Sequence, residues 1–216
     1  RGANHQYAKD VATRPERGAP SNVLILDCTL RDGGYYNDWD YSFDLVKRYC
    51  DAMAAAKIDI VELGFRTLQS TQYLGATAYT TDAFIERLAI PQSLQLAVML
   101  NAKELLNATD QRTAIRSTFA RRANSQVSMV RIAANRNEVA TLGPAIEELR
   151  ELGYQVALNL MQISEIALEH ITAFGQQAKS FDVAYAYIAD SFGSLRPSNL
   201  PPIMRALGDG FGTAIG

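Results

Sequence analysis

A regular alternation of short apolar runs with segments of helical spacing constrains the fold of this chain most. The apolar runs cover residues 22–27, 58–65, 94–100, 126–133, 154–161 and 182–190. The segments with helical periodicity cover 42–57, 81–90, 101–106, 112–123, 136–153, 164–180 and 196–207. Unbroken apolar runs between helices are typical of parallel strands covered on both faces. The sequence therefore predicts an α/β fold with six β-α units, and the tail at 210–216 is the candidate start of one more strand.

Two α/β architectures fit this alternation, a doubly wound open sheet and a (β/α)8 TIM barrel. Four polar residues lie at or near the carboxyl ends of different predicted strands: Asp27, Glu62, Asn159 and Asp190. In a barrel the carboxyl ends of all strands converge on one mouth, where active sites are built. In an open sheet they would spread along an edge, and no G-x-G-x-x-G follows the first strand to indicate a nucleotide site. The polar strand ends therefore favour the barrel.

The domain organisation follows from the same pattern. Residues 1–22 are polar and aperiodic, so we expect an N-terminal extension, with the barrel domain spanning 23–216. A full barrel typically needs about 250 residues. With 216 residues and Arg as the first of them, the chain is expected to be a barrel cut short after about six β-α units, with its C-terminal strands missing.

Composition and charge limit the classes of binding partner and the compartment that are expected. The formal net charge is -2 and no apolar run is long enough to span a bilayer, so neither nucleic acid nor a membrane is an expected partner. Two cysteines, Cys28 and Cys50, do not make a disulfide framework, which favours a reducing cytoplasm.

The stretch "LDCTLRDGG" (26–34) carries the chemistry-bearing residues closest to a strand end. The carboxylate of Asp32 is a suitable hard oxygen ligand for Mg²⁺ or Mn²⁺. The guanidinium of Arg31 could stabilise the enolate oxygen that forms when a C–C bond beside a 2-oxo acid breaks. Gly33 and Gly34 are expected to make a sharp backbone turn next to substrate. An Arg-Asp pair is also common in ordinary loops, and from the residues alone a solvated salt bridge is the more frequent explanation.

The same stretch resembles the first-strand signature of the DRE-TIM metallolyases, D-x-T-L-R-D-G, without a mismatch. That family includes 4-hydroxy-2-oxovalerate aldolase, 3-hydroxy-3-methylglutaryl-CoA lyase, and the isopropylmalate and homocitrate synthases. Two further segments are similar to the family's second and sixth strands, "VELGF" (61–65) and "YIADSFGSLRP" (187–197). Three matching segments in the family's order are specific for the family, whereas one segment alone would not be.

The resemblance implies that Asp32 binds a divalent metal ion, Mn²⁺ or Mg²⁺, and that Arg31 is catalytic. The family's other metal ligands form an H-x-H pair on the seventh strand, which is absent here; the histidines are His5 and His170. In the hydroxy-oxovalerate aldolases a histidine acts as the base three residues after the metal aspartate, where this chain has Tyr35. Tyr35 is therefore the candidate acid-base residue, with a packing role as the alternative.

Several other residues have both a functional and a structural interpretation. Glu62 is expected to contact Arg31, either to orient it at a substrate site or as a structural ion pair. Arg66 is a candidate for binding a substrate carboxylate or phosphate, and a charge at the rim is the commoner explanation. Asp190 and Ser191 lie in a family segment and are candidates for substrate binding, with Asp190 also able to orient Arg31. Asn159 and Gln162 would contact substrate or cap the next helix, and Asp27 is expected to support the site from behind the residues that touch substrate.

The function expected from the resemblance is a divalent-metal-dependent aldolase or lyase. It would act on a small 2-oxo acid and an aldehyde partner through the metal-bound enolate of pyruvate or a close analogue. One alternative is a Claisen-type synthase that condenses an acyl-CoA with a 2-oxo acid, although the family's Glu-Gln after R-D-G is absent. The other is a barrel that has lost catalysis and serves as a binding module. Barrels of this kind are often homo-oligomers, but the sequence shows no interface pattern.

Overall fold

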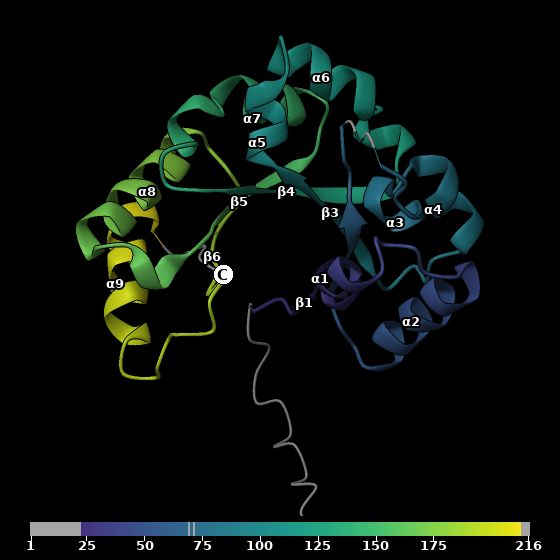
Figure 1. Ribbon diagram of the computed structural model, residues 1–216, viewed down its shortest axis with the longest axis horizontal. Helices are drawn as coiled ribbons and strands as arrows, with labels where there is room; N and C mark the ends of the chain where they lie inside the picture. Colours follow the sequence, from purple (N-terminus) through teal and green to yellow (C-terminus); the bar gives the residue numbers. More distant parts are fainter. Residues whose placement is uncertain (1–22, 69, 71, 213–216) are drawn as a thin grey trace, which may run out of the picture.

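The computed structural model describes residues 23–68, 70 and 72–212, and within them six parallel strands form one sheet in the order β1-β2-β3-β4-β5-β6. The strands are β1 (Leu26–Asp27), β2 (Ile60–Phe65), β3 (Gln95–Asn101), β4 (Val127–Ala134), β5 (Gln155–Leu160) and β6 (Tyr185–Ile188). Each strand pairs with its successor in the chain, as in a TIM barrel and unlike the reversed order of a doubly wound sheet. Figure 1 shows the sheet curled, with β1 and β6 at its two ends and the helices on its convex side. The predicted TIM-barrel class of α/β fold is confirmed.

Helices follow the strands along the chain. They are α1 (Thr29–Gly33), α2 (Phe43–Ala55), α3 (Ala76–Tyr79), α4 (Asp82–Leu88), α5 (Ala102–Asn107), α6 (Gln111–Thr118), α7 (Gly143–Glu151), α8 (Leu168–Ser180) and α9 (Leu200–Phe211). Four 3-10 turns are η1 (Gly34–Tyr36), η2 (Arg122–Asn124), η3 (Val139–Thr141) and η4 (Ile163–Glu165). Ser42 and Thr81 are the N-caps of α2 and α4, because their hydroxyls accept the Leu45 and Phe84 N–H groups at 3.3 Å.

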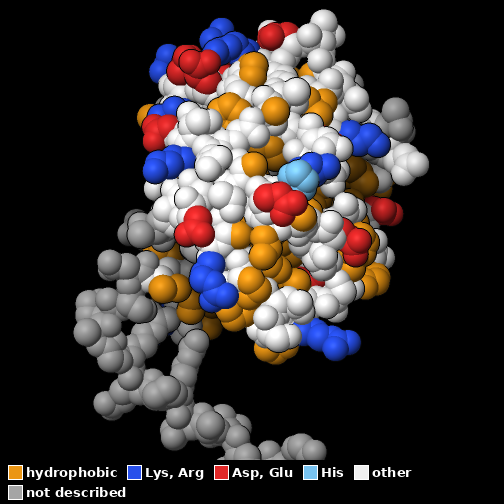
Figure 2. All heavy atoms as spheres, turned by 90° about the vertical axis from the view of Figure 1, so that its left-hand side faces the viewer, with side chains coloured by type: hydrophobic (Ala, Val, Ile, Leu, Met, Phe, Trp, Pro, Cys, Tyr) orange, Lys and Arg blue, Asp and Glu red, His pale blue; other side chains and the backbone are white. Residues whose placement is uncertain are grey.

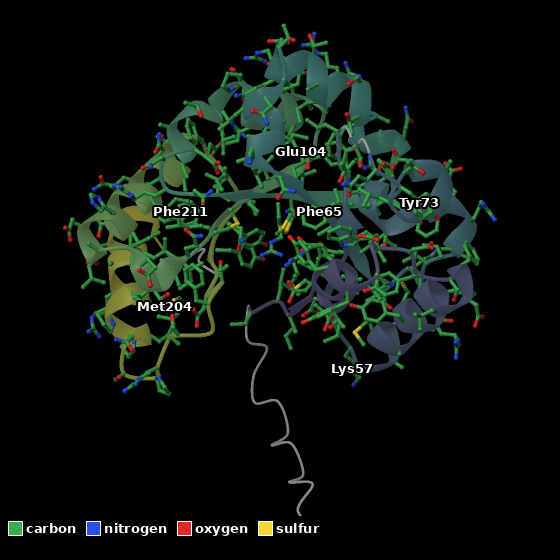
Figure 3. All side chains as sticks on the ribbon, viewed as in Figure 1. Lys57, Phe65, Tyr73, Glu104, Met204 and Phe211 are labelled. Atoms are coloured by element: carbon green, nitrogen blue, oxygen red, sulfur yellow. The ribbon has the colours of Figure 1, made fainter. Side chains whose placement is uncertain are left out.

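Two apolar regions flank the sheet. The larger core lies between the sheet and the helices, where outward-facing residues such as Val61 and Val130 meet helix residues such as Val46 and Ile85. The inner face carries two smaller clusters, one of Ile60, Ala97, Met129 and Ala157 and one of Phe65, Met99 and Ala133. Figure 3 shows Phe65 on the inner side of the curled sheet. Covering on both faces explains why the strands read as unbroken apolar runs.

Several predicted boundaries are wrong. The helix expected over 112–123 ends at Thr118, and the one expected over 196–207 spans Leu200–Phe211. The helix expected from 164 begins at Leu168, because Ile166 has an extended backbone that ends the preceding 3-10 turn. The helix expected over 136–153 is confined to Gly143–Glu151, with a separate 3-10 turn before it. Gly210 and Phe211 belong to α9 and do not start a strand. Residues 213–216 and the predicted extension, 1–22, lie outside the described residues.

The surface formed by α8 and α9 carries acidic and basic side chains intermixed with apolar ones, without a large area of one sign (Figure 2). None of the helices in the described part of the chain is both long enough and apolar enough to cross a membrane.

Candidate active site

The first motif folds into a short helix. β1 ends at Asp27, whose carboxylate accepts the Thr29 N–H at 2.9 Å and the Thr29 hydroxyl at 3.2 Å, so that α1 begins at Thr29. Gly33 and Gly34 have φ angles of -67° and -62°, which are right-handed helical values. The predicted sharp Gly-Gly turn is therefore wrong, because these glycines continue a helical path that other residues could also follow.

Gly34 is needed for a different reason, which is the close approach of an aromatic ring. A Cβ atom on residue 34 would lie 2.0 Å from Cδ1 of Trp39. The indole Nε1 of Trp39 donates a hydrogen bond of 2.8 Å to the Arg31 carbonyl oxygen. The same ring makes edge-to-face contacts with Tyr35 and Phe65, at centroid distances of 4.8 and 5.3 Å. Trp39 therefore ties α1 to the inner face of β2.

Arg31 is held on two sides by carboxylates. Its Nε donates to Glu62 Oε1 and its Nη1 to Asp32 Oδ1, both at 2.8 Å. Glu62 is fully buried on β2, whereas the Asp32 side chain is 70% exposed. Burial works against the charge of Arg31, but the Glu62 carboxylate outweighs it and holds the pKa of Arg31 above its ordinary value. The predicted contact between Glu62 and Arg31 is confirmed, and Glu62 is too deep to touch substrate itself.

A second arginine, Arg131, completes the buried part of the site, and we do not predict it from the sequence. Its Nη1 donates to Glu62 Oε2 at 2.8 Å and its Nη2 to Asn159 Oδ1 at 3.1 Å. Arg131 and Asn159 are each 6% exposed and come from the neighbouring strands β4 and β5. The sequence did hold a signal: Arg131 is a lone charge inside the apolar run 126–133, and such a charge needs a partner when it is buried.

Tyr35 lies beside this group on η1. Its side chain is 63% exposed and one edge packs against Trp39. Partial burial raises the pKa of the Tyr35 phenol; the nearby charge of Arg31 acts in the opposite direction without reversing the shift. At neutral pH Tyr35 therefore carries its proton, so it can donate a proton more readily than it can accept one.

Asp190 and Ser191 organise the loop after β6. Both Asp190 oxygens are engaged, with Oδ1 accepting the Ser194 N–H at 3.1 Å and Oδ2 the Leu195 N–H at 2.8 Å. These backbone hydrogen bonds lower the pKa of Asp190. The Ser191 hydroxyl accepts the Gln162 N–H at 3.1 Å, which links the loops after β5 and β6. The structure shows no contact between Asp190 and Arg31, so the predicted orienting role of Asp190 is not seen.

Two residues predicted for the site lie elsewhere. Arg66 is 2% exposed; its Nη2 donates to the Thr80 carbonyl at 2.7 Å and to Asp82 at 3.1 Å, and its guanidinium stacks on Phe119. This side chain is part of the packing between the sheet and the outer helices. Asp27 also faces outward, because its carboxylate accepts the hydroxyl of Tyr49 on α2. Adjacent residues of a strand point to opposite faces, so Asp27 at the end of β1 cannot share the inner face with Leu26.

Open space lies at the strand ends of the same sheet. Two hollows, of about 490 and 400 Å³, lie at the carboxyl ends of β3, β4 and β5. They share Asn135, Glu138 and Met161, and Met161 packs against the inner-face cluster that contains Phe65. Polar groups at their walls include Asn101, Lys103 and Gln162. The carboxyl ends of these three strands therefore have room for a small molecule, although Arg31 itself does not line either hollow.

The described residues provide an incomplete set of metal ligands. No group of three or more His, Cys, Asp or Glu side chains within 23–68, 70 and 72–212 is placed to hold a metal ion. Asp32 Oδ2 has no hydrogen-bond partner among the described residues and can supply one carboxylate ligand. Divalent cations of this class need six or more oxygen ligands, so this donor set does not by itself make a site.

Comparisons with known proteins agree with this picture. An HMGL-like family model matches residues 22–212. Oxaloacetate decarboxylase from Mycobacterium tuberculosis is 24% identical over 85% of this chain and 52% of its own length. A 4-hydroxy-2-oxovalerate aldolase from Bacillus cereus is 25% identical over 93% of this chain and 57% of its own length. The chain thus spans about half the length of these curated relatives.

Solved structures show the same fold. Hydroxymethylglutaryl-CoA lyase from Pseudomonas aeruginosa superposes with a TM-score of 0.69 at 13% identity, covering 91% of this chain and 67% of that one. The carboxyl transferase domain of Rhizobium etli pyruvate carboxylase gives a TM-score of 0.66 at 15% identity, covering 89% of this chain and 34% of that one. The resemblance to the DRE-TIM metallolyases that the sequence motifs indicate is thereby confirmed. Since the family model spans nearly all of the described residues, the chain belongs to the HMGL-like family.

Proposed function

We propose that this chain carries part of the active site of a carbon–carbon lyase that acts beside a small 2-oxo acid. The two curated relatives are named for oxaloacetate decarboxylation and 4-hydroxy-2-oxovalerate cleavage. Loss of carbon dioxide from oxaloacetate and loss of an aldehyde from 4-hydroxy-2-oxovalerate both leave the enolate of pyruvate. An enzyme of either kind therefore needs a cation at the enolate oxygen. Pyruvate or a close analogue, with an aldehyde as the second partner, is our proposed substrate class.

The observation that carries this proposal is the arrangement of Arg31. Its Nε and Nη1 are committed to Glu62 and Asp32, while Nη2 has no partner among the described residues and is not a buried atom. A guanidinium fixed on two nitrogens has little rotational freedom left to lose when substrate binds. Nη2 can then donate to an enolate oxygen as negative charge develops there, which is the interaction that lowers the barrier.

Tyr35 is our proposed proton donor. Its phenol is protonated at neutral pH and it lies three residues after Asp32, next to the ring of Trp39. In decarboxylation, a proton from Tyr35 would pass to the carbon of the pyruvate enolate once carbon dioxide has left. In cleavage of a 4-hydroxy-2-oxo acid, the 4-hydroxyl proton would pass to solvent as the aldehyde leaves, and Tyr35 would again protonate the enolate carbon. In condensation, solvent would take the methyl proton and Tyr35 would protonate the alkoxide formed from the aldehyde carbonyl.

A divalent ion, Mn²⁺ or Mg²⁺, is proposed as the cofactor, with Asp32 as the one ligand from the described residues. Such an ion would polarise the oxygens of the 2-oxo acid. Ser191 and Asp190 would shape the substrate pocket through the loops that they connect. A cytoplasmic location and a homo-oligomer stay predictions.

The test is the exchange of the pyruvate methyl protons with deuterated water, followed by NMR with and without added Mn²⁺. Arg31→Ala should lower the exchange rate by about 10²- to 10³-fold, the usual effect of losing one oxyanion donor. Arg48→Ala is the matched control, because Arg48 also pairs with an aspartate, Asp44, but on the exposed face of α2. Equal rates for Arg31→Ala and the wild type would remove Arg31 from the mechanism.

Other outcomes would favour the alternative functions. Condensation of an acyl-CoA in place of enolisation would favour the synthase. Binding without turnover would favour the binding module.

A further inference from the structure

Four side chains form one continuous hydrogen-bonded row across the inner face. The row runs from Arg31 on α1 to Glu62 on β2, Arg131 on β4 and Asn159 on β5. Its first two links are 2.8 Å long and its last is 3.1 Å. Glu62 is its pivot, because one carboxylate oxygen serves each arginine. A change at Arg131 can therefore reach Arg31 through Glu62 alone.

The Arg131 side chain is buried and closely packed. Its guanidinium carbon lies 4.4 Å from the ring centroid of Tyr187 on β6, and the side chain is 7% exposed. Its Nε is buried without a hydrogen-bond partner. Burying a cation with an unsatisfied nitrogen is costly. That cost is offset only in part by one carboxylate, which Arg131 shares with Arg31, so two buried or nearly buried positive charges face a single buried negative one.

Sharing Glu62 determines how Arg31 is held. Because Oε2 of Glu62 accepts from Arg131, only Oε1 is available to Arg31, and Arg31 binds it through Nε. If Oε2 were free, Arg31 could turn to bind both oxygens with its Nη2 and Nε, the bidentate geometry that arginine and carboxylate prefer. Nη2 would then point at Glu62 and away from the mouth.

We propose that Arg131 is a positioning residue that keeps Nη2 of Arg31 available to substrate by occupying the second oxygen of Glu62. Its effect on turnover rests on the proposed function, whereas its effect on the geometry of Arg31 does not.

The experiment uses Arg131→Lys in the full chain. Lysine keeps the positive charge, but its single ammonium group cannot bridge Glu62 and Asn159 as the planar fork does. The first readout is the rate at which the Arg31 Nε–H proton exchanges with water. NMR monitors its signal, which is assigned as the one that is missing in Arg31→Lys. The second is kcat and KM for the pyruvate exchange reaction. We expect faster exchange of that proton and a fall in kcat of about 10²-fold, the size expected when a reacting group is displaced by about 1 Å, with little change in KM.

Arg66→Lys is the matched control. Arg66 is also a buried arginine with an unpartnered Nε and an aromatic ring beneath it, but it pairs with Asp82 outside the site. Arg66→Lys should lower the free energy of unfolding without changing the exchange rate of the Arg31 Nε–H or kcat per folded molecule. If Arg131→Lys does not fold, Asn159→Ala removes one bond to Arg131 and leaves all charges in place, with the same direction expected.

The outcomes separate the two proposals. If the Arg31 Nε–H exchanges at the wild-type rate in both Arg131→Lys and Asn159→Ala, the positioning role is overturned. If the wild type is active, an unchanged kcat in Arg131→Lys also overturns the positioning role. If the proton exchanges faster but the wild type shows no turnover, the positioning of Arg31 stands and the proposed function fails. In an active enzyme, adding Arg131→Lys to Arg31→Lys should cost little more than Arg31→Lys alone, because the path runs through Arg31.

Discussion

The indole ring of Trp39 occupies the space that a side chain on Gly34 would need, with Cδ1 of the ring 2.0 Å from the position of a Cβ atom there. This contact holds the ring where it bonds the Arg31 carbonyl and covers Phe65. The glycine of the motif thus serves packing against an aromatic side chain and not a turn.

Gly34→Ala should therefore displace Trp39 and lower the free energy of unfolding by about 1–3 kcal/mol, as overpacking does. Gly33→Ala is the control, since its Cβ would meet only the Tyr41 hydroxyl, at 3.0 Å, at the end of a flexible side chain. Urea unfolding measures the stability. Trp39 is the single tryptophan of the chain, so its emission spectrum reports the displacement directly. An unshifted spectrum with wild-type stability in Gly34→Ala would contradict this contact.

The hydrogen bond from Tyr49 to Asp27 should stabilise the fold in a pH-dependent way. Burial alone would raise the pKa of Asp27, but hydrogen bonds from Tyr49 and Thr29 outweigh it and hold that pKa below its ordinary value. A depressed carboxyl pKa contributes stability above the unfolded pKa of about 3.9, and this contribution is lost as the pH falls through the folded pKa.

Tyr49→Phe should accordingly cost about 1 kcal/mol of unfolding free energy at neutral pH and less in acid. Tyr154→Phe is the control, because the Tyr154 hydroxyl donates to the carbonyl oxygen of Ala120, which does not titrate. Its cost should stay constant over the same acid range. Unfolding in urea across a pH series checks both, and a parallel pH dependence of the two variants would argue against the role of Asp27.

The proton of Tyr35 predicts a limit to activity at high pH. Burial raises the pKa of this phenol above its usual value near 10, against the lowering effect of Arg31 and with the raising effect of Asp32 and Glu62. The acid form is therefore present throughout the neutral range and is lost as the pH rises through the folded pKa.

Tyr35→Phe should reduce kcat by about 10²- to 10⁴-fold, the usual contribution of general acid-base catalysis, and abolish the alkaline fall in rate. Tyr36→Phe, at a neighbouring hydroxyl that is 96% exposed, should leave both unchanged. A pH–rate profile of pyruvate formation from oxaloacetate makes the comparison, because there the enolate forms by loss of carbon dioxide and then needs a proton donor. A Tyr35→Phe enzyme that keeps the wild-type profile would assign Tyr35 to packing alone.

Asp32 is the one residue of the site whose carboxylate is mostly exposed. If it is a metal ligand, Mn²⁺ should bind the full chain in the presence of pyruvate, and Asp32→Asn should weaken that binding by at least about tenfold. Asp44→Asn removes a similar exposed carboxylate paired with Arg48 and should have no effect. Titration of free Mn²⁺ by electron paramagnetic resonance measures the affinity. Equal affinity of the wild type and Asp32→Asn would exclude Asp32 as a ligand.

The architecture follows from the sequence because its signal is local and repeated. Six apolar runs bounded by helical segments require buried parallel strands, and the polar residues at their ends favour a barrel over an open sheet. The pairing of Arg31 with Glu62 was also within reach, since Arg31 closely follows the first strand and Glu62 is a charge inside the apolar run of the second. A charged residue at such a position must find an opposite charge on the same face.

The sequence by itself determined the order of strands and helices and the family. Tertiary structure alone decided which face each polar side chain occupies. Asp27 ends β1 and Glu62 lies within β2, yet the first bonds α2 and the second the inner arginines. The alternation of side chains along a strand sends neighbours to opposite faces, so an error of one residue in phase exchanges inside for outside. Arg66 and Arg131 differ in the same way, and only the packed sheet shows which of the two buried arginines meets Glu62.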